Sequence, residues 1–225
     1  MKKNFAIILA RKGSKGIKDK NLVKVNGKPL IYWSIKSCLK SKKINSVWVS
    51  SDSKKILGLS KSYGSNIITR PLKYASDNAS SESAWLHAIL HLKKKNILPE
   101  SIIGIQPTSP IRSPKDLDYA IIKYYRCKLD SLFSAQKISN HFIWHNTKKK
   151  LKANYDYKNR PMRQEIGEKY LENGSFYIFN ANKFIKKKCR LFGKIGVFIM
   201  NKVKSFEIDD KEDLDLLRTL KKYFY

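Results

Sequence analysis

The sequence predicts an α/β protein with a mostly parallel, doubly wound sheet. Short apolar runs that suit buried strands alternate along the chain with stretches of helical periodicity. Repeated strand–helix–strand units of this kind give parallel strands with right-handed crossovers, so helices cover both faces of the sheet. With 225 residues and 42% hydrophobic content, the chain is long enough to bury a full core and too apolar to be disordered.

Strands are expected where the apolar runs are short. They cover Phe5–Leu9, Val47–Ser50, Ile67–Thr69, Ile102–Ile105, Ser131–Ala135, Ser175–Phe179 and Val197–Met200. Helices are expected between and after these strands. They cover Leu30–Lys40, Lys54–Tyr63, Ser81–Lys94, Asp116–Tyr125, Ala181–Lys187 and Glu212–Lys222. Pro29 and Pro114 stand just before the first and fourth helices, where proline is favoured as a helix start.

The pattern weakens between Lys137 and Tyr170. A long connection without clear elements inside a compact domain is usually functional or disordered. Aromatic residues scattered through this stretch, such as Trp144 and Tyr157, argue against disorder. Because Trp and Tyr are enriched at protein interfaces, we expect residues 137–170 to form an arm or small subdomain at a subunit interface.

A basic loop with two glycines follows the first expected strand. It combines Gly13 and Gly16 with the cations Arg11, Lys15 and Lys20. Glycine lets backbone N–H groups turn toward an anion, arginine can grip phosphate with two parallel bonds, and lysine adds a point charge. The loop matches neither the P-loop nor the dinucleotide-binding fingerprint. The residues alone therefore leave two interpretations, a polyphosphate site and a basic surface turn.

Two segments stand where ligands of a doubly wound sheet bind. Such ligands lie beyond the carboxyl ends of the strands, near a reversal of strand order. The basic loop follows one strand end, and the segment 106–110 (Gln-Pro-Thr-Ser-Pro) follows the strand over Ile102–Ile105. Both are therefore expected at the ligand-binding edge of the sheet.

A pair of carboxylates stands near the carboxyl end of the chain. Alternation along an extended segment puts Glu207 and Asp209 on the same face. Two carboxylates on one face can hold Mg²⁺, which prefers oxygen ligands together with substrate phosphates. An acidic helix start is the alternative, because the run from Asp209 to Asp213 also suits an N-terminal cap.

Several segments carry a family resemblance in the same order along the chain. They are the run Ala10–Gly16 with Lys20 and Asn21, then Gly27–Leu30, Thr69–Pro71, Ala75–Ser81, Gln106–Arg112, Arg163–Gln164, Asn173–Ile178 and Glu207–Asp210. Together they resemble the acylneuraminate cytidylyltransferases, also called CMP-sialic acid synthetases. The resemblance implies a Rossmann-like sheet of the nucleotidyltransferase type in a single cytidylyltransferase domain over 1–225, with 137–170 as a small dimerisation arm and a homodimer as the assembly.

The resemblance also implies an enzymatic reaction. The family transfers CMP from CTP to the anomeric hydroxyl of a nonulosonic (sialic-type) acid, with Mg²⁺ and release of pyrophosphate. The same fold and nucleotide also serve other 2-keto sugar acids, such as Kdo, pseudaminic acid and legionaminic acid, and these stay open as alternatives.

Residue roles follow from positions that match the family's motifs. Arg11, Lys20 and Asp209 are implied as catalytic; Lys15, Asn21, Arg70 and Ser81 as CTP-binding; Gln106 and Arg163 as sugar-acid-binding; and Glu207 and Asp209 as the Mg²⁺ ligands. The chain departs from the family at Glu207, where the family has aspartate. It departs again at Lys12, where a small or neutral polar residue is common.

The charge of the chain is extreme. Lys+Arg 47 against Asp+Glu 18 gives a formal net charge of +29, which attracts polyanions such as nucleotides or nucleic acid. A basic nucleic-acid-binding module is therefore the rival from another class. However, most cations are lysines spread along the chain, and no stacking-aromatic signature of RNA-binding modules is present, so nucleic acid is not the expected partner.

Cysteine usage and hydropathy bear on compartment. The three cysteines, Cys38, Cys127 and Cys189, are far apart, and no C-x-x-C is present. Free thiols are typical of a reducing cytoplasm. No stretch is long and apolar enough to span a bilayer, so neither a membrane nor a secretory route is expected.

Overall fold

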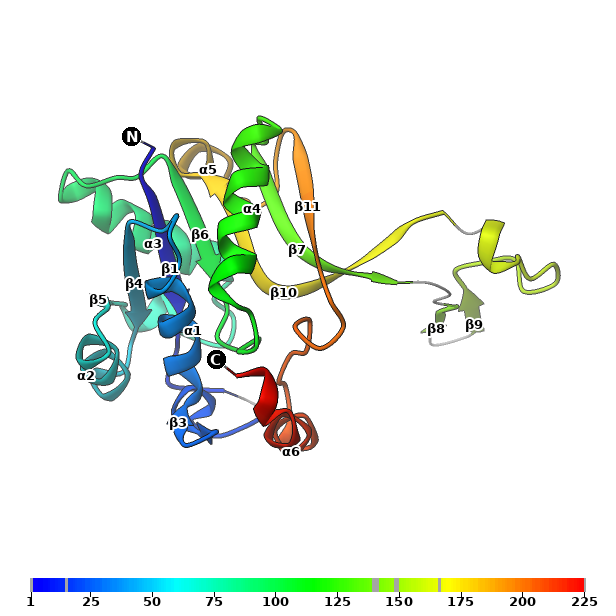
Figure 1. The fold of residues 1–225 in the computed structure, drawn as a ribbon, viewed down its shortest axis with the longest axis horizontal. Helices are drawn as coiled ribbons and strands as arrows, with labels where there is room; N and C mark the ends of the chain where they lie inside the picture. Colours follow the sequence, from blue (N-terminus) through cyan, green and yellow to red (C-terminus); the bar gives the residue numbers. More distant parts are fainter. Residues whose placement is uncertain (1, 15, 139–141, 148–149, 166, 225) are drawn as a thin grey trace.

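A seven-stranded sheet organises the fold in the computed structural model, which describes residues 2–14, 16–138, 142–147, 150–165 and 167–224 (Figure 1). The strand order is β11-β7-β10-β6-β1-β4-β5. These strands are β1 (Asn4–Leu9), β4 (Ser46–Ser51), β5 (Asn66–Thr69), β6 (Ser101–Ile105), β7 (Ser131–Ile138), β10 (Lys169–Asn180) and β11 (Ile195–Met200). β10 runs antiparallel to β6 and β7, and the other neighbouring pairs are parallel. The prediction of a mostly parallel sheet is confirmed.

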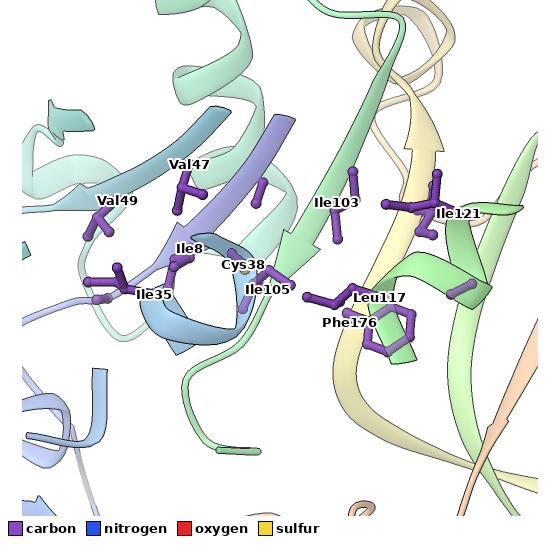
Figure 2. Close-up of a cluster of buried hydrophobic side chains, with 14 of the residues drawn as sticks. Ile8, Ile35, Cys38, Val47, Val49, Ile103, Ile105, Leu117, Ile121 and Phe176 are labelled. Atoms are coloured by element: carbon purple, nitrogen blue, oxygen red, sulfur yellow. The ribbon is translucent and has the colours of Figure 1, made fainter. Parts of the chain in front are cut away.

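Helices cover both faces of this sheet. One face carries α1 (Leu30–Leu39), α2 (Lys54–Ser62) and α4 (Pro114–Arg126), and the other carries α3 (Ser81–Lys94) and α5 (Ala181–Lys187). Residues of β1 alternate between two buried clusters, because successive side chains of a strand point to opposite faces. Ile8 packs with Ile35 and Leu117 on the α1/α4 side (Figure 2), whereas Ile7 packs with the α3 side.

Side-chain caps fix where the helices begin. Ser113 and Asp116 form a reciprocal capping box at the start of α4, with Pro114 in the first turn. The helix therefore begins two residues before the expected Asp116. At the carboxyl end of the chain, Asp210 and Asp213 form a second capping box at the start of α6 (Lys211–Thr219).

The strand order reverses between β1 and β6. The chain passes from β1 to β4 and β5 on one side, then returns to β6 on the other side of β1. The loops that follow β1 and β6 consequently leave the sheet at the same edge, and the gap between diverging crossovers there is the usual ligand site of such sheets. In Figure 1 this edge lies at the bottom of the view, next to α6.

A third buried cluster joins the two ends of the chain at this edge. Ile17 from the loop after β1 packs with Ile208 and with Leu217 of α6. The loop also contains a short 3-10 helix (Lys20–Leu22) and a two-residue ribbon turn between β2 (Lys24–Val25) and β3 (Lys28–Pro29). Apolar packing thus holds the amino-terminal loop against the carboxyl-terminal segment.

The expected arm projects from the side of the domain. β7 and β10 extend beyond the sheet into it, and Figure 1 shows its tip well outside the body of the molecule. The arm contains an antiparallel hairpin of β8 (Trp144–Thr147) and β9 (Lys150–Ala153), which the sequence analysis did not anticipate. Almost every residue of these two strands is exposed, so no buried face imposes the apolar alternation by which a strand is recognised.

Candidate active site

A cavity of about 530 Å³ opens at the switch point between β1 and β6. Its walls come from the loop after β1, the segment after β5, the start of α3, the loop after β6 and the segment before α6. The sequence-predicted site residues that line it are Arg11, Lys20, Asn21, Arg70, Ser81, Gln106 and Asp209. Residues far apart in the sequence are thus brought to one cavity.

The cation Lys20 contacts the carboxyl-terminal acidic segment directly. Its Nζ donates to the carbonyl oxygen of Ile208 at 2.6 Å and lies 3.4 Å from Asp209 Oδ1. The Lys20 side chain is only 11% exposed, whereas that of Asp209 is 76% exposed. The pair therefore joins a buried ammonium to a carboxylate that remains open to the cavity.

Gly16 brings the basic loop into backbone contact with the same segment. A Cβ atom at this position would lie 2.0 Å from the carbonyl oxygen of Asp209, which no real side chain tolerates. The close approach therefore requires glycine at position 16, because glycine has no side chain. No sequence pattern reveals this contact, because its partners are separated by most of the chain.

Arg11 is engaged by the opposite wall of the cavity. Its Nη1 lies 2.8 Å from Asp77 Oδ1 and donates to the carbonyl oxygen of Ser76 at 3.2 Å. Asn21 also holds this loop, since its Nδ2 donates to the Arg11 carbonyl at 3.0 Å. Arg11 thus faces the cavity in an ion pair that an anionic ligand has to replace.

Arg70 is the most unusual cation of the site. It is 5% exposed, yet its Nε and Nη2 have no hydrogen-bond partner among the described residues. Burial lowers the pKa of its guanidinium; the Asp52 carboxylate opposes this shift, and Arg11 adds to it. Buried donors without acceptors are costly, so an acceptor that reached these nitrogens would be bound favourably.

Glu207, the residue before Ile208, is held by Thr108 from the loop after β6. Thr108 Oγ1 donates to Glu207 Oε1 at 2.9 Å, and the Ile208 N–H donates to the Thr108 carbonyl at 2.9 Å. Burial raises the pKa of the Glu207 carboxyl; the Thr108 hydrogen bond opposes the rise, and the Asp209 charge adds to it. Gln106 lies nearby, because a Cβ at Gly174 would be 3.1 Å from Glu207 Oε1 and 3.2 Å from Gln106 Oε1.

The acidic residues between Glu207 and Asp213 form two groups with different roles. Asp210 accepts from the Asp213 N–H, and Asp213 Oδ2 accepts from the backbone of Asp209 and Asp210, so these two carboxylates cap α6. The helix-start alternative therefore accounts for Asp210 and Asp213. It leaves the carboxylates of Glu207 and Asp209, on either side of the buried Ile208, outside the capping box.

This donor set fits Mg²⁺ bound together with phosphates. No group of three or more His, Cys, Asp and Glu side chains within the described ranges could hold a metal ion alone. Mg²⁺ commonly binds through one or two carboxylates, with waters and substrate phosphates completing its coordination. Asp209 supplies one such carboxylate at the cavity, beside Lys20. Glu207, two residues earlier, is not among the residues that line the cavity, and its role as a second ligand stays a prediction.

For two expected site residues the structure describes no side chain. Lys15 lies outside the described residues. Arg163 begins a 3-10 turn in the arm (Arg163–Glu165), and its side chain also lies outside the described part of the chain. The expected roles of both remain predictions.

The cavity has wall residues to which the sequence analysis gave no role there. Tyr74, from the turn after β5, and Asp77 both line it. Ser80 caps α3 by accepting from the Ser83 N–H, and it lines the cavity as well. Asp77 and Ser80 belong to the segment Ala75–Ser81, which is one of those that carry the family resemblance.

The fold and the position of this cavity define an α/β protein of the nucleotidyltransferase type. A family model described as Cytidylyltransferase matches residues 5–225, and the chain belongs to that family. A solved structure titled CMP:2-keto-3-deoxy-manno-octonic acid synthetase complexed with CTP has the same fold. Its TM-score is 0.72 at 17% identity, with 98% of each chain covered.

Two curated relatives show the range of substrates among similar proteins. An N-acylneuraminate cytidylyltransferase of Oncorhynchus mykiss is 37% identical over 77% of this chain and 40% of its own length. A pseudaminic acid cytidylyltransferase of Campylobacter jejuni is 27% identical over 98% of this chain and 97% of its own length. The chain spans about half or less of the length of the N-acylneuraminate cytidylyltransferases that it matches.

Proposed function

We propose that this protein transfers CMP from CTP to the anomeric hydroxyl of a nonulosonic acid and releases pyrophosphate. The proposal rests on the meeting of Lys20 and Asp209 at a cavity that is also lined by Arg70, two of whose guanidinium nitrogens have no hydrogen-bond partner among the described residues. Cations for a triphosphate and oxygen ligands for its metal ion then share one site. Family membership and the activities named for the relatives support the same conclusion.

The chain's residues neutralise and position the reactants. Arg11 exchanges its bond with Asp77 for the triphosphate, and Lys20, with Lys15, adds positive charge. Glu207 and Asp209 would hold Mg²⁺, which supplies further charge neutralisation at the phosphates. The oxygen of the anomeric hydroxyl attacks the α-phosphorus and releases its proton to solvent. The bond from the α-phosphorus to the oxygen bridging to the β-phosphate breaks, and pyrophosphate leaves with the electron pair. Positioning and charge stabilisation supply most of the rate enhancement in this kind of transfer.

The remaining site residues divide between the two substrates. We assign Arg70, Asn21 and Ser81 to CTP, and Gln106 and Arg163 to the sugar acid. Gln106 lines the cavity next to Gly174.

Replacement of Arg70 by methionine tests the nucleotide wall. Because a hydrogen bond to a charged group contributes about 1.5–3 kcal/mol, we expect a 10- to 100-fold rise in the Kd for CTP. The melting temperature should stay level or rise, because methionine removes buried donors that have no partner. Titration calorimetry and thermal unfolding measure both, with Arg126→Met on the exposed face of α4 as the matched control. Unchanged CTP affinity in the Arg70 variant would contradict this assignment.

A product assay tests the proposed reaction. Purified protein is incubated with CTP, Mg²⁺ and each of a panel of 2-keto sugar acids, and pyrophosphate is measured. We expect release with a nonulosonic acid and none with UTP or ATP in place of CTP. N-acetylneuraminic acid is the first substrate to try. Pseudaminic acid is the second, because the relative with that activity matches the chain over nearly its whole length.

The same preparation separates the reaction from nucleic-acid binding. If no acid in the panel gives pyrophosphate while labelled RNA or DNA binds with strong salt dependence, the basic surface and not the cavity is the functional site. We expect the opposite result, because the cations of the cavity are placed around an acidic segment that a nucleic-acid groove would not contain.

We also propose that the arm is a homodimer contact. Leu151 and Trp144 of the hairpin are 65% and 45% exposed, and Trp144 packs against Tyr157 with ring centroids 5.3 Å apart. Exposed apolar and aromatic side chains on a projecting element mark an interaction surface. We also propose that the protein is cytoplasmic, because its three cysteines are free thiols. Among the described residues, no helix is long and apolar enough to cross a membrane.

A charge on the arm should disrupt the dimer. We expect wild-type protein to elute at twice the chain mass and Leu151→Asp to shift toward the monomer, with a dimer Kd raised about 10-fold or more. Size-exclusion chromatography with light scattering measures the mass. Ile122→Asp, which charges an exposed apolar position on α4 instead, should leave the dimer intact. A monomeric wild type would contradict the proposal.

A further inference from the structure

Arg112 is a permanently charged side chain placed wholly inside the domain. It is 0% exposed and is among the largest fully buried side chains of the described chain. Taking a guanidinium out of water costs several kcal/mol unless hydrogen bonds replace its hydration. The hydrogen bonds that the buried guanidinium makes therefore explain why an arginine stands at position 112.

The guanidinium connects three elements at the edge of the cavity. Nη1 donates to the carbonyl and the hydroxyl of Ser175 on β10, at 2.6 and 2.9 Å. Nη2 donates to Ser34 Oγ on α1 at 2.6 Å and to the Gln106 carbonyl at the end of β6 at 3.1 Å. The planar fork of arginine suits this task, because it fixes the directions of all these bonds at once.

Both backbone segments held by Arg112 lead into the sugar-acid side of the proposed site. Gln106 presents its side chain to the cavity, and Thr108, two residues further on, holds Glu207. Ser175 follows Gly174, whose positive φ of 61° disfavours a side chain and whose Cβ position would be in tight contact with the side chains of Gln106 and Glu207. The Gln106 N–H also donates to the Ser175 carbonyl at 3.3 Å. The guanidinium therefore reinforces a direct backbone hydrogen bond between the two segments.

The nucleotide side of the cavity is held by other contacts. Lys20 is fixed by the Ile208 carbonyl, Arg11 by Asp77, and the backbone of Arg70 by the Ser51 carbonyl. From this division we infer that Arg112 is a positioning residue for the second substrate: it fixes the backbone of Gln106 relative to that of Ser175 and thereby shapes the sugar-acid side, whereas the cations assigned to CTP are held by other contacts. The expected kinetic effect on the sugar acid rests on the proposed function. The expected effect on the backbone of Gln106 and Ser175 does not depend on that function.

Arg112→Lys tests the positioning role, because lysine keeps the charge and loses the fork. We expect kcat/KM for the sugar acid to fall about 10- to 100-fold, as misplacement of a binding group does, with the CTP affinity measured without Mg²⁺ changed less than about twofold. Arg126→Lys on the surface of α4 is the control and should change neither. A proportional loss of CTP affinity and sugar-acid turnover, or no loss at all, would overturn the inference.

Hydrogen exchange gives a second readout that needs no turnover. In Arg112→Lys, amides of residues 105–109 and 173–176 should exchange about 10-fold faster or more, whereas those of the loop over 16–23 should not. If wild-type protein shows no activity with any acid, the proposed function fails, and this exchange pattern still decides the role of Arg112. Uniformly faster exchange, or none, would overturn that role.

Ser175→Ala covers the case in which Arg112→Lys does not fold. It removes one acceptor of the guanidinium and keeps the Ser175 carbonyl and the packing. A rise of about threefold or more in the sugar-acid KM at unchanged CTP affinity is expected from the loss of one hydrogen bond of this kind. Equal effects on both substrates would count against the inference here as well.

Discussion

Asp209→Asn is expected to abolish turnover while the protein stays folded. The substitution keeps the shape of the side chain and removes the charge that faces the cavity, so the metal-bound nucleotide loses a ligand. We expect kcat/KM to fall about 1000-fold or more, equivalent to about 4 kcal/mol of transition-state stabilisation. Pyrophosphate release measures the loss, and circular dichroism measures the fold.

The matched control for this variant is Asp215→Asn. Asp215 lies on α6, close in sequence, and its side chain is 71% exposed in an ion pair with Arg218. Surface pairs of this kind contribute little to stability, so the control should keep near-normal activity. Near-normal activity in Asp209→Asn would remove the metal role from that residue.

Lys20→Ala should produce the second large loss. Without the ammonium, the developing charge on the phosphates is uncompensated, and removal of one such preorganised donor lowers turnover about 100- to 1000-fold. The Ile208 carbonyl also loses its 2.6 Å hydrogen bond, which destabilises the fold by about 1–3 kcal/mol. Kinetics at saturating and limiting CTP and urea unfolding separate the two effects.

Lys24→Ala removes an exposed lysine from the neighbouring ribbon and serves as the control for charge alone. With a net charge of +29, loss of one surface cation changes the overall field little, so this variant should match wild type. Equal losses in Lys20→Ala and Lys24→Ala would assign the effect to the general field and not to the contact with the acidic segment.

The sheet could be predicted because its strands are buried. Parallel strands covered on both faces give short continuous apolar runs, such as that in β1, and these are visible without a structure. The hairpin of β8 and β9 and the outer part of β10 carry almost no buried residues, so the same signal is missing there. Burial, more than strand propensity, decided which elements the sequence revealed.

The chemistry of the site was visible in the sequence, but its contacts were not. Motif resemblance selected Lys20 and Asp209 from among 47 cations and 18 acids. The closeness of Gly16 to the Asp209 carbonyl depends on apolar packing of Ile17 with Ile208, which joins segments nearly 200 residues apart. Arg112 belonged to a recognised motif, yet only its burial and its four acceptor contacts show what the guanidinium connects.

We propose that the amino-terminal cations and the carboxyl-terminal carboxylates share one magnesium-bound nucleotide. This sharing can be measured by titration calorimetry of CTP, with and without Mg²⁺, on wild-type protein and Asp209→Asn. We predict that Mg²⁺ tightens CTP binding by wild type about 10-fold or more, as gain of a metal–carboxylate contact implies, and that Asp209→Asn loses this increment while keeping its metal-free affinity. The same Mg²⁺ increment in both proteins would contradict the claim.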